Sequence, residues 1–291
     1  DIKIIVFKIL KMKSCGWNKY SQLDKKSNNK DSDGEPIISP PCDFHVDSSS
    51  ILSFSMHYKQ TIWIMNNGKA YGIGDNSDSR ISGLLSRTIL KEDTEIVFED
   101  PLGRPYKFIS VVCGQCYTLY LVSEESNTNK LNVILCHKDQ NPNPLFLNIG
   151  NRIPRALFGG ECTSGIIDTE GGIIIIKASV LKSPTAQITP IFLPSGDKPV
   201  KLACCDEFVI ALGQSGRIYE TELSNDIPQK FIQVKDLSNK TVVDISGTMD
   251  CCFAVINNGE VFGRGSNIRC KLGLPEETRS VSSFTKIGSL K

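Results

Sequence analysis

The sequence has few of the side chains and patterns on which enzymes and metal-binding proteins depend. Only three histidines occur among 291 residues, and His45, His57 and His137 lie far apart, with no cysteine or carboxylate cluster at metal-ligand spacing. No nucleophile elbow, zinc-protease motif or paired carboxylates in a recognisable context are present. We therefore expect no catalytic residue, no metal site and no cofactor, and so no enzyme.

Charge of one sign and long apolar runs are also absent. Lys and Arg number 33 against 32 Asp and Glu, which leaves a net charge of +1 and no overall attraction to nucleic acid or to an acidic membrane surface. The apolar start "DIKIIVFKILKMK" is interrupted by lysines, and it is too short to span a bilayer. The sequence predicts a soluble monomer with neither nucleic acid nor membrane as a partner.

Cysteine is plentiful, but its arrangement does not indicate chemistry. The eleven cysteines are odd in number, and most lie in apolar runs such as "DCCFAVI". "CGQC" (Cys113 to Cys116) has redox spacing, but strand-like residues flank it on both sides, and a thioredoxin-like site needs a strand followed by a helix. Buried, reduced thiols are the simpler interpretation, and they favour a cytoplasmic location, with a nuclear one as the alternative.

Helical periodicity is missing as well, whereas glycines recur at a regular interval. "NNGKAYG", "EGGIIII", "QSGRIYE" and "NNGEVFG" supply marker glycines at Gly68, Gly172, Gly216 and Gly259, the last three separated by 44 and 43 residues. A short apolar strand precedes each marker and another follows it, which is the pattern of a β-hairpin. All-β units of roughly 40–50 residues are typical of propeller blades.

A further motif follows some of the hairpins. "GWNKYSQLD", "GDNSDSRIS" and "GSNIRCKLG" align without a gap, with Gly-x-Asn at the start and a branched aliphatic residue at the eighth position. Together with "NNGKAYG" and "NNGEVFG", this motif resembles the regulator of chromosome condensation repeat, in which a glycine hairpin is followed by G-x-N-x-x-G-Q-L-G. The resemblance covers roughly residues 12–291, and it is strong in the second and last units, fair in the first and poor in the three middle ones.

The resemblance implies an all-β propeller of four-stranded blades. About six units are recognisable, at residues 12–50, 51–107, 108–154, 155–199, 200–241 and 242–291, after an apolar strand or extension at 1–11. Because the family usually has seven blades, we expect either a truncated seven-bladed ring or a ring closed by "IKIIVFKIL" pairing with the last blade.

The signature residues have structural roles in this interpretation. Glycine supplies the positive φ of tight turns, and asparagine can hydrogen-bond the turn backbone. "GRGSNI" is therefore part of a blade and not a phosphate loop, which would need a helix directly after it. The predicted signature positions are Gly16, Asn18, Leu23, Gly68, Gly74, Asn76, Gly172, Gly216, Gly259, Gly265, Asn267 and Leu272.

Loops on the propeller faces are the candidates for partner binding. "EDPLGRPYKF" and "NPNPLFLNIGNRIP" mix aromatic, proline and arginine residues, as protein-binding surfaces often do. Arg104, Tyr106, Phe146 and Arg152 are the predicted contacts. The family resemblance implies a non-enzymatic scaffold or adaptor that holds a protein partner, or alternatively a guanine-nucleotide exchange factor for a Ran-type small GTPase.

Overall fold

The structure is a computed structural model. It describes residues 13–17, 29–30, 36–43, 46–57, 59–76, 80–82, 88–125, 127–137, 144–177, 189–224 and 227–288. The predicted extension 1–11, His45 and the signature residues Asn18 and Leu23 lie outside the described residues. By the contacts between Cα atoms, the chain divides into two compact units, residues 1–147 and 148–291.

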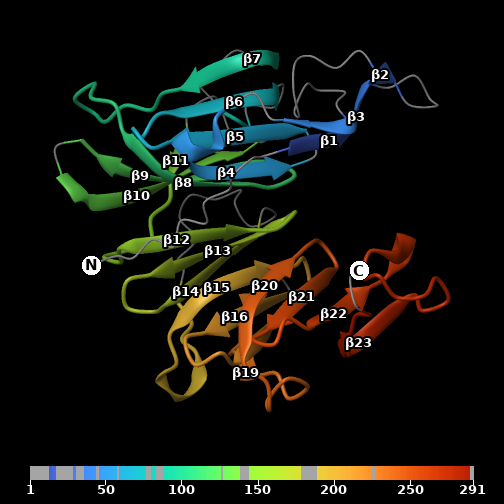
Figure 1. Cartoon of the computed structure of the whole chain (residues 1–291). Coiled ribbons are helices and arrows are strands. Elements are labelled where there is room, and N and C mark those ends of the chain that lie inside the picture. The colour runs from blue at the N-terminus through green and yellow to red at the C-terminus, as the bar shows by residue number, and fades with distance from the viewer. Residues whose placement is uncertain are drawn as a thin grey trace. The chain divides into compact units, whose positions relative to one another are not determined.

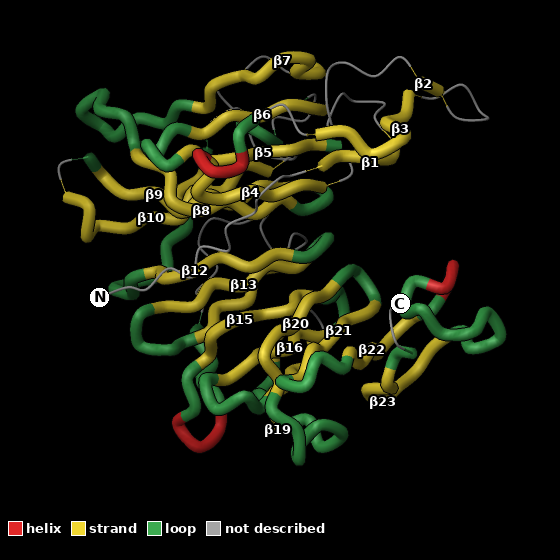
Figure 2. Tube along the Cα trace, viewed as in Figure 1, coloured by secondary structure: helices red, strands yellow, loops and turns green. Residues whose placement is uncertain are grey.

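The regular secondary structure of the described residues is almost entirely β-strand, which Figure 2 shows in yellow between green loops. Their helices are short 3-10 turns at Ser48–Ser50, Pro194–Gly196 and Ile268–Cys270. None of these described helices is long and apolar enough to cross a membrane.

The first unit holds three antiparallel sheets, coloured blue to green in Figure 1. The first contains β1 (Lys13–Trp17), β3 (Pro36–Asp43) and β2 (Asn29–Lys30), in that order. The second is a meander of β4 (Ile51–His57), β5 (Gln60–Met65), β6 (Ala70–Asp75) and β7 (Ile89–Ile96). The third is a meander of β8 (Lys107–Cys113), β9 (Tyr117–Glu124), β10 (Asn127–His137) and β11 (Leu145–Phe146).

The second unit also holds three antiparallel sheets. One contains β12 (Pro154–Gly159), β13 (Thr163–Asp168) and β14 (Ile173–Lys177), and an isolated bridge joins Ile173 to Ile191. The next contains β15 (Pro199–Cys204), β16 (Phe208–Gly213), β17 (Ile218–Ser224), β18 (Ile227–Pro228) and β19 (Ile232–Gln233). The last contains β20 (Val242–Gly247), β21 (Cys251–Ile256), β22 (Val261–Ser266) and β23 (Ser280–Lys286).

The sheets repeat one another in register as well as in order. Five sheets begin with a strand that pairs with the next strand along the chain, namely the sheets that start with β4, β8, β12, β15 and β20. In each of them this pairing shifts by one residue near the start of the first strand, for example between Phe108 and Ser110 and between Val242 and Asp244. The register between β1 and β3 shifts just before Gly16. The register between β6 and β7 shifts in the same way just before Gly74. Thus β1 and β3 correspond to the third and fourth strands of the later sheets.

The core of each unit forms where neighbouring sheets pack face to face. The second strands "QTIWIM" and "TSGIID" are buried over nearly their whole length, because both of their faces are covered. In the first unit Ile62, Phe108 and Tyr120 belong to one apolar cluster that spans two sheets, and in the second unit Ile210 and Ile245 do the same. Burial of this apolar surface is the main contribution that stabilises the packing of neighbouring sheets in each unit.

Four hairpin glycines hold the left-handed position of equivalent turns. Gly68, Gly171, Gly216 and Gly259 have φ between +78° and +88°, and each donates its N–H to the carbonyl three residues earlier. The sequence prediction placed this role on Gly172, but the positive φ belongs to Gly171. The reason is that Asp168 N–H bonds to the carbonyl of Gly172, which makes Gly172 the residue after the turn.

The Gly-x-Asn motif closes the loop that follows a third strand. Gly74 and Gly265 have φ of +111° and +106°, and an added Cβ would meet a carbonyl oxygen at 2.3 and 2.2 Å respectively. Asn76 and Asn267 are buried and hydrogen-bond the backbone of the loop ahead, including Ile81 N–H and Leu272 N–H at 3.0 Å each. The side chains of Ile81 and Leu272 in these loops are in turn buried.

Candidate protein-binding site

The predicted loop between β7 and β8 is held in a fixed shape by Asp100. Its side-chain oxygen accepts the N–H groups of Leu102 at 2.8 Å and Arg104 at 3.0 Å, and its other oxygen accepts Arg104 Nε at 2.8 Å. The hydrogen bonds from Arg104 are the main cause that lowers the pKa of the Asp100 carboxyl. Gly103 turns the chain with φ +76°, and Leu102 projects at the tip with 76% of its surface exposed.

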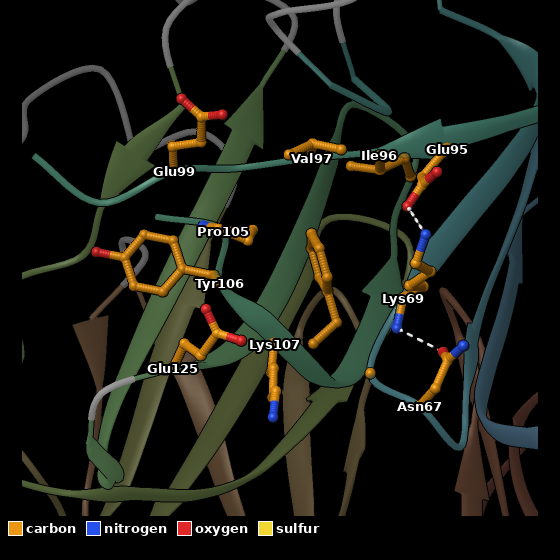
Figure 3. A pocket seen from close by; sticks show the side chains of 12 residues that line it. Asn67, Lys69, Glu95, Ile96, Val97, Glu99, Pro105, Tyr106, Lys107 and Glu125 are labelled. Carbon is orange, nitrogen blue, oxygen red and sulfur yellow. Dashed lines mark hydrogen bonds and ion pairs between the residues drawn. The ribbon is translucent and has the colours of Figure 1, made fainter. Parts of the chain in front are cut away.

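A shallow hollow of about 390 Å³ lies beside this loop, within the first unit. Figure 3 shows Val97, Pro105 and Tyr106 around it, together with Asn67 and Lys69 from the neighbouring hairpin. Val97 is 42% exposed, whereas Tyr106 is buried. We call this hollow and the adjoining tip of the loop the β7–β8 groove. Its surface is apolar, with charged residues at the rim.

The rim combines an ion pair with two carboxylates. Lys69 Nζ lies 2.9 Å from Glu95 Oε1, and this hydrogen bond is the main cause that raises the pKa of Lys69. Glu99 and Glu125 also line the hollow, and neither has an ion-pair or hydrogen-bond partner for its side chain among the described residues. Lys107 also lines the hollow, so the rim has three carboxylates against two ammonium groups and a small net negative charge next to apolar surface.

Of the four predicted contacts, Tyr106 lines the hollow, Arg104 lies in the adjoining loop and Phe146 packs against Tyr106. The ring of Tyr106 lies against that of Phe146, with centroids 5.7 Å apart, and Phe146 is 43% exposed. Arg104 is engaged with Asp100 as described above, so its guanidinium orders the loop. Burial is the main cause that raises the pKa of Tyr106. Of the three, only Phe146 offers a largely exposed apolar surface.

The fourth predicted contact, Arg152, lies in the second unit. Its guanidinium forms an ion pair with the buried carboxylate of Asp168, reaches Glu170 at 3.4 Å, and stacks 5.5 Å from the centre of the Phe192 ring. Asp168 also accepts the N–H groups of Glu170 and Gly172. These contacts brace the β13–β14 hairpin.

The histidines and cysteines of the described residues do not assemble into a reactive site. No group of three His, Cys, Asp or Glu side chains there is placed to hold a metal ion. Burial raises the pKa of the Cys113 thiol in "CGQC" to about 12, so the reactive thiolate does not form near neutral pH. Desolvation, with the nearby charges of Arg80 and Lys59, lowers the pKa of His57 to about 4.

Sequence reasoning missed the residues that come to the groove from a distance. Asn67, Lys69 and Glu125 belong to the hairpins β5–β6 and β9–β10, and only the packing of one sheet on the next brings them beside the β7–β8 loop. The glycine pattern around Gly68 predicts the β5–β6 hairpin itself. It does not predict the packing that brings this hairpin beside Lys107.

Comparison with solved structures defines the class as β-propeller. The chain aligns over 96% of its length with yeast RCC1 (Prp20) in its complex with Kap60, at a TM-score of 0.69 and 12% identity, covering 71% of that protein. A separate structure of Prp20p from Saccharomyces cerevisiae gives a TM-score of 0.70 at 13% identity, over 95% of this chain and 74% of that one. Human WBSCR16 aligns over 94% and 93% of the two chains at 15% identity, with a TM-score of 0.52.

Sequence comparison finds a relative with a related name. The chain is 23% identical over 247 residues to the RCC1-like G exchanging factor-like protein of Mus musculus, which covers 77% of this chain and 46% of the mouse protein. The chain thus spans less than half the length of this curated relative. No family model matches it. The propeller fold and this relative support the resemblance of the glycine hairpins to the regulator of chromosome condensation repeat.

Proposed function

We propose that this protein is a non-enzymatic scaffold or adaptor that holds a protein partner at the β7–β8 groove. The supporting observation is the exposed apolar surface of Val97, Leu102 and Phe146 around a loop whose backbone is fixed by Asp100. Exposed apolar surface with a polar rim is characteristic of protein-interaction sites. A fixed loop loses little conformational entropy when a partner binds, which favours affinity.

The family comparison supports a protein as the ligand. Yeast RCC1 is described in complex with Kap60, and Prp20p is described by its binding to Gsp1p and histones. These partners belong to those proteins. For the present chain they support the class of function, namely recognition of another protein by a propeller.

The test is a quantitative comparison of captured proteins using the full chain and two matched variants. Val97→Ser combined with Leu102→Ser removes exposed apolar surface at the groove. Ile89→Ser changes a residue that is 40% exposed at the far end of β7, roughly 23 Å away for seven residues of strand. We expect a reproducible partner to be retained by Ile89→Ser and lost by the double variant. A partner that all three capture equally would contradict binding at this groove.

Guanine-nucleotide exchange on a Ran-type GTPase is the second candidate, favoured by the name of the mouse relative. Exchange needs no covalent chemistry, because the propeller would stabilise the nucleotide-free GTPase. The deciding measurement is release of a fluorescent guanine nucleotide from a Ran-type GTPase. Acceleration by orders of magnitude over the intrinsic rate would establish exchange, and an unchanged rate would favour the scaffold.

A further inference from the structure

The charges at the rim of the β7–β8 groove are unevenly compensated. Three basic side chains near it are already engaged: Lys69 with Glu95 at 2.9 Å, Arg104 with Asp100 at 2.7 Å, and Lys130 with Glu124 at 2.5 Å. The charged groups that remain at the hollow are the exposed carboxylates of Glu99 and Glu125 and the exposed ammonium of Lys107.

The placement of these three groups favours a cation at one side of the hollow. Figure 3 shows Glu99 and Glu125 on either side of Pro105 and Tyr106, while Lys107 extends away from Glu99. A positive charge bound beside Pro105 would therefore lie between two carboxylates.

The shape of the groove favours a peptide over a compact small molecule. A hollow of about 390 Å³ is near the lower end of ligand pockets, which span roughly 300–1,000 Å³. The apolar surface continues beyond it to Leu102 at the tip of the loop and to Phe146, which packs on Tyr106. An extended segment can fill the hollow with one side chain and cover the neighbouring apolar surface with another.

We propose that the β7–β8 groove binds an extended peptide segment of the partner, in which a lysine or arginine adjoins an apolar side chain. The apolar side chain fills the hollow beside Val97 and Pro105, and the basic one meets Glu99 and Glu125. This inference rests on the proposed scaffold function and adds the chemistry of the segment that the scaffold recognises.

The experiment uses a phage-displayed library of random peptides as the probe and the full chain as the target. Peptides that bind are sequenced, and the tightest is measured by fluorescence polarisation. We expect the selected sequences to be enriched in Lys or Arg next to Leu, Phe or Trp. Selection of acidic sequences, or of purely apolar ones, would overturn the proposal.

Charge variants with a matched control locate the binding. Glu99→Gln combined with Glu125→Gln should lower the affinity for the selected peptide about tenfold in 0.1 M salt. The effect should be smaller near 1 M salt, because the Debye length falls from about 10 Å to about 3 Å. Glu92→Gln combined with Glu207→Gln removes the same number of exposed carboxylates elsewhere and should leave the affinity unchanged.

The outcomes separate this inference from the function on which it rests. If Val97→Ser with Leu102→Ser abolishes peptide binding but the charge variants do not, the groove binds proteins and the basic residue in our proposal is wrong. If neither pair of variants affects the peptide, peptide recognition at the groove is wrong. Partner capture by the wild-type and control chains then decides separately whether the scaffold function stands.

Discussion

At the scale of single residues, the hairpin glycines share a backbone conformation but not their surroundings. A Cβ on Gly216 would lie 2.7 Å from Thr241 Cγ2 and one on Gly68 would lie 3.3 Å from Lys107 Cβ, whereas one on Gly259 would meet nothing within 4 Å. A substitution at Gly259 therefore isolates the cost of the left-handed conformation, while one at Gly216 adds a steric clash.

Gly259→Val should lower the free energy of unfolding by about 1–3 kcal/mol, because a β-branched residue is strained at φ +85°. Urea unfolding followed by circular dichroism measures the change. Gly259→Asn serves as the control and should cost less, since asparagine tolerates this conformation. A valine variant as stable as the wild type would refute the structural role of the hairpin glycine.

Cys270 is an exposed residue held at φ +54°, and it occupies the sixth position of "GSNIRCKLG", where the family pattern has glycine. Cys270→Gly should raise the free energy of unfolding by about 0.5–1 kcal/mol, because relief of the left-handed strain exceeds the added entropy of the unfolded chain. Cys270→Ala removes the thiol but keeps the Cβ, and it should give no such gain. Equal effects of the two changes would assign the gain to the thiol.

At the scale of structural elements, the loop between β22 and β23 depends on one buried amide. Asn267 Oδ1 accepts Leu272 N–H at 3.0 Å, and Nδ2 donates to the carbonyls of Pro275 at 3.1 Å and Thr278 at 2.7 Å. These bonds satisfy backbone groups of a loop that has no regular structure beyond the 3-10 turn at Ile268–Cys270.

Asn267→Ala should destabilise the protein by about 2–4 kcal/mol, because it removes several hydrogen bonds and leaves the buried Leu272 N–H without this partner. Hydrogen exchange of the Leu272 amide, compared with amides of β21, reports whether the loss is local. Asn258→Ala is a suitable control, because Asn258 is exposed and bonds only within its own turn, to Glu260 N–H. A loss no larger than that of the control would show that Asn267 does not hold the loop.

The hairpins were predictable from sequence, because turn glycines and short apolar strands are local signals. Between the adjacent Gly171 and Gly172, the sequence prediction assigned the turn position one residue too late. Either glycine can take a positive φ, and only the hydrogen bonds of Asp168 distinguish them. The shift in register between Val242 and Asp244 leaves no comparable mark. The shift lies next to Val242, whose N–H bonds the carbonyl of Gly216 in the neighbouring sheet, and the β7–β8 groove likewise combines residues of two sheets.

At the scale of the whole molecule, the pH dependence of stability reflects residues that resist protonation in the fold. Desolvation and the positive charges of Arg80 and Lys59 lower the pKa of His57 from 6.5 to about 4. The unfolded chain therefore binds more protons than the folded one between these values. Stability contributed by neutral His57 is present above pH 6.5 and is lost as the pH falls towards 4.

The loss across this window should be about 1–2 kcal/mol, which is less than the full linkage value because the ring is partly exposed to solvent. His57→Gln, which stays neutral, should flatten the dependence of unfolding free energy on pH between 6.5 and 4. Parallel curves for the variant and the wild type would exclude His57 as the source. Carboxylates contribute to both proteins alike, so the difference between the curves isolates the imidazole.

Main-chain hydrogen bonds join one sheet to the next: Phe108 N–H donates to the carbonyl of Gly68 and Val242 N–H to that of Gly216, each at 2.9 Å. Such a bond does not depend on which side chain the donor carries. Pro199, at the matching position of β15, cannot donate at all, and its sheet still forms. Most side chains at these positions can therefore be replaced without loss of the hydrogen bonds between neighbouring sheets. Such tolerance agrees with a TM-score near 0.7 at 12–13% identity.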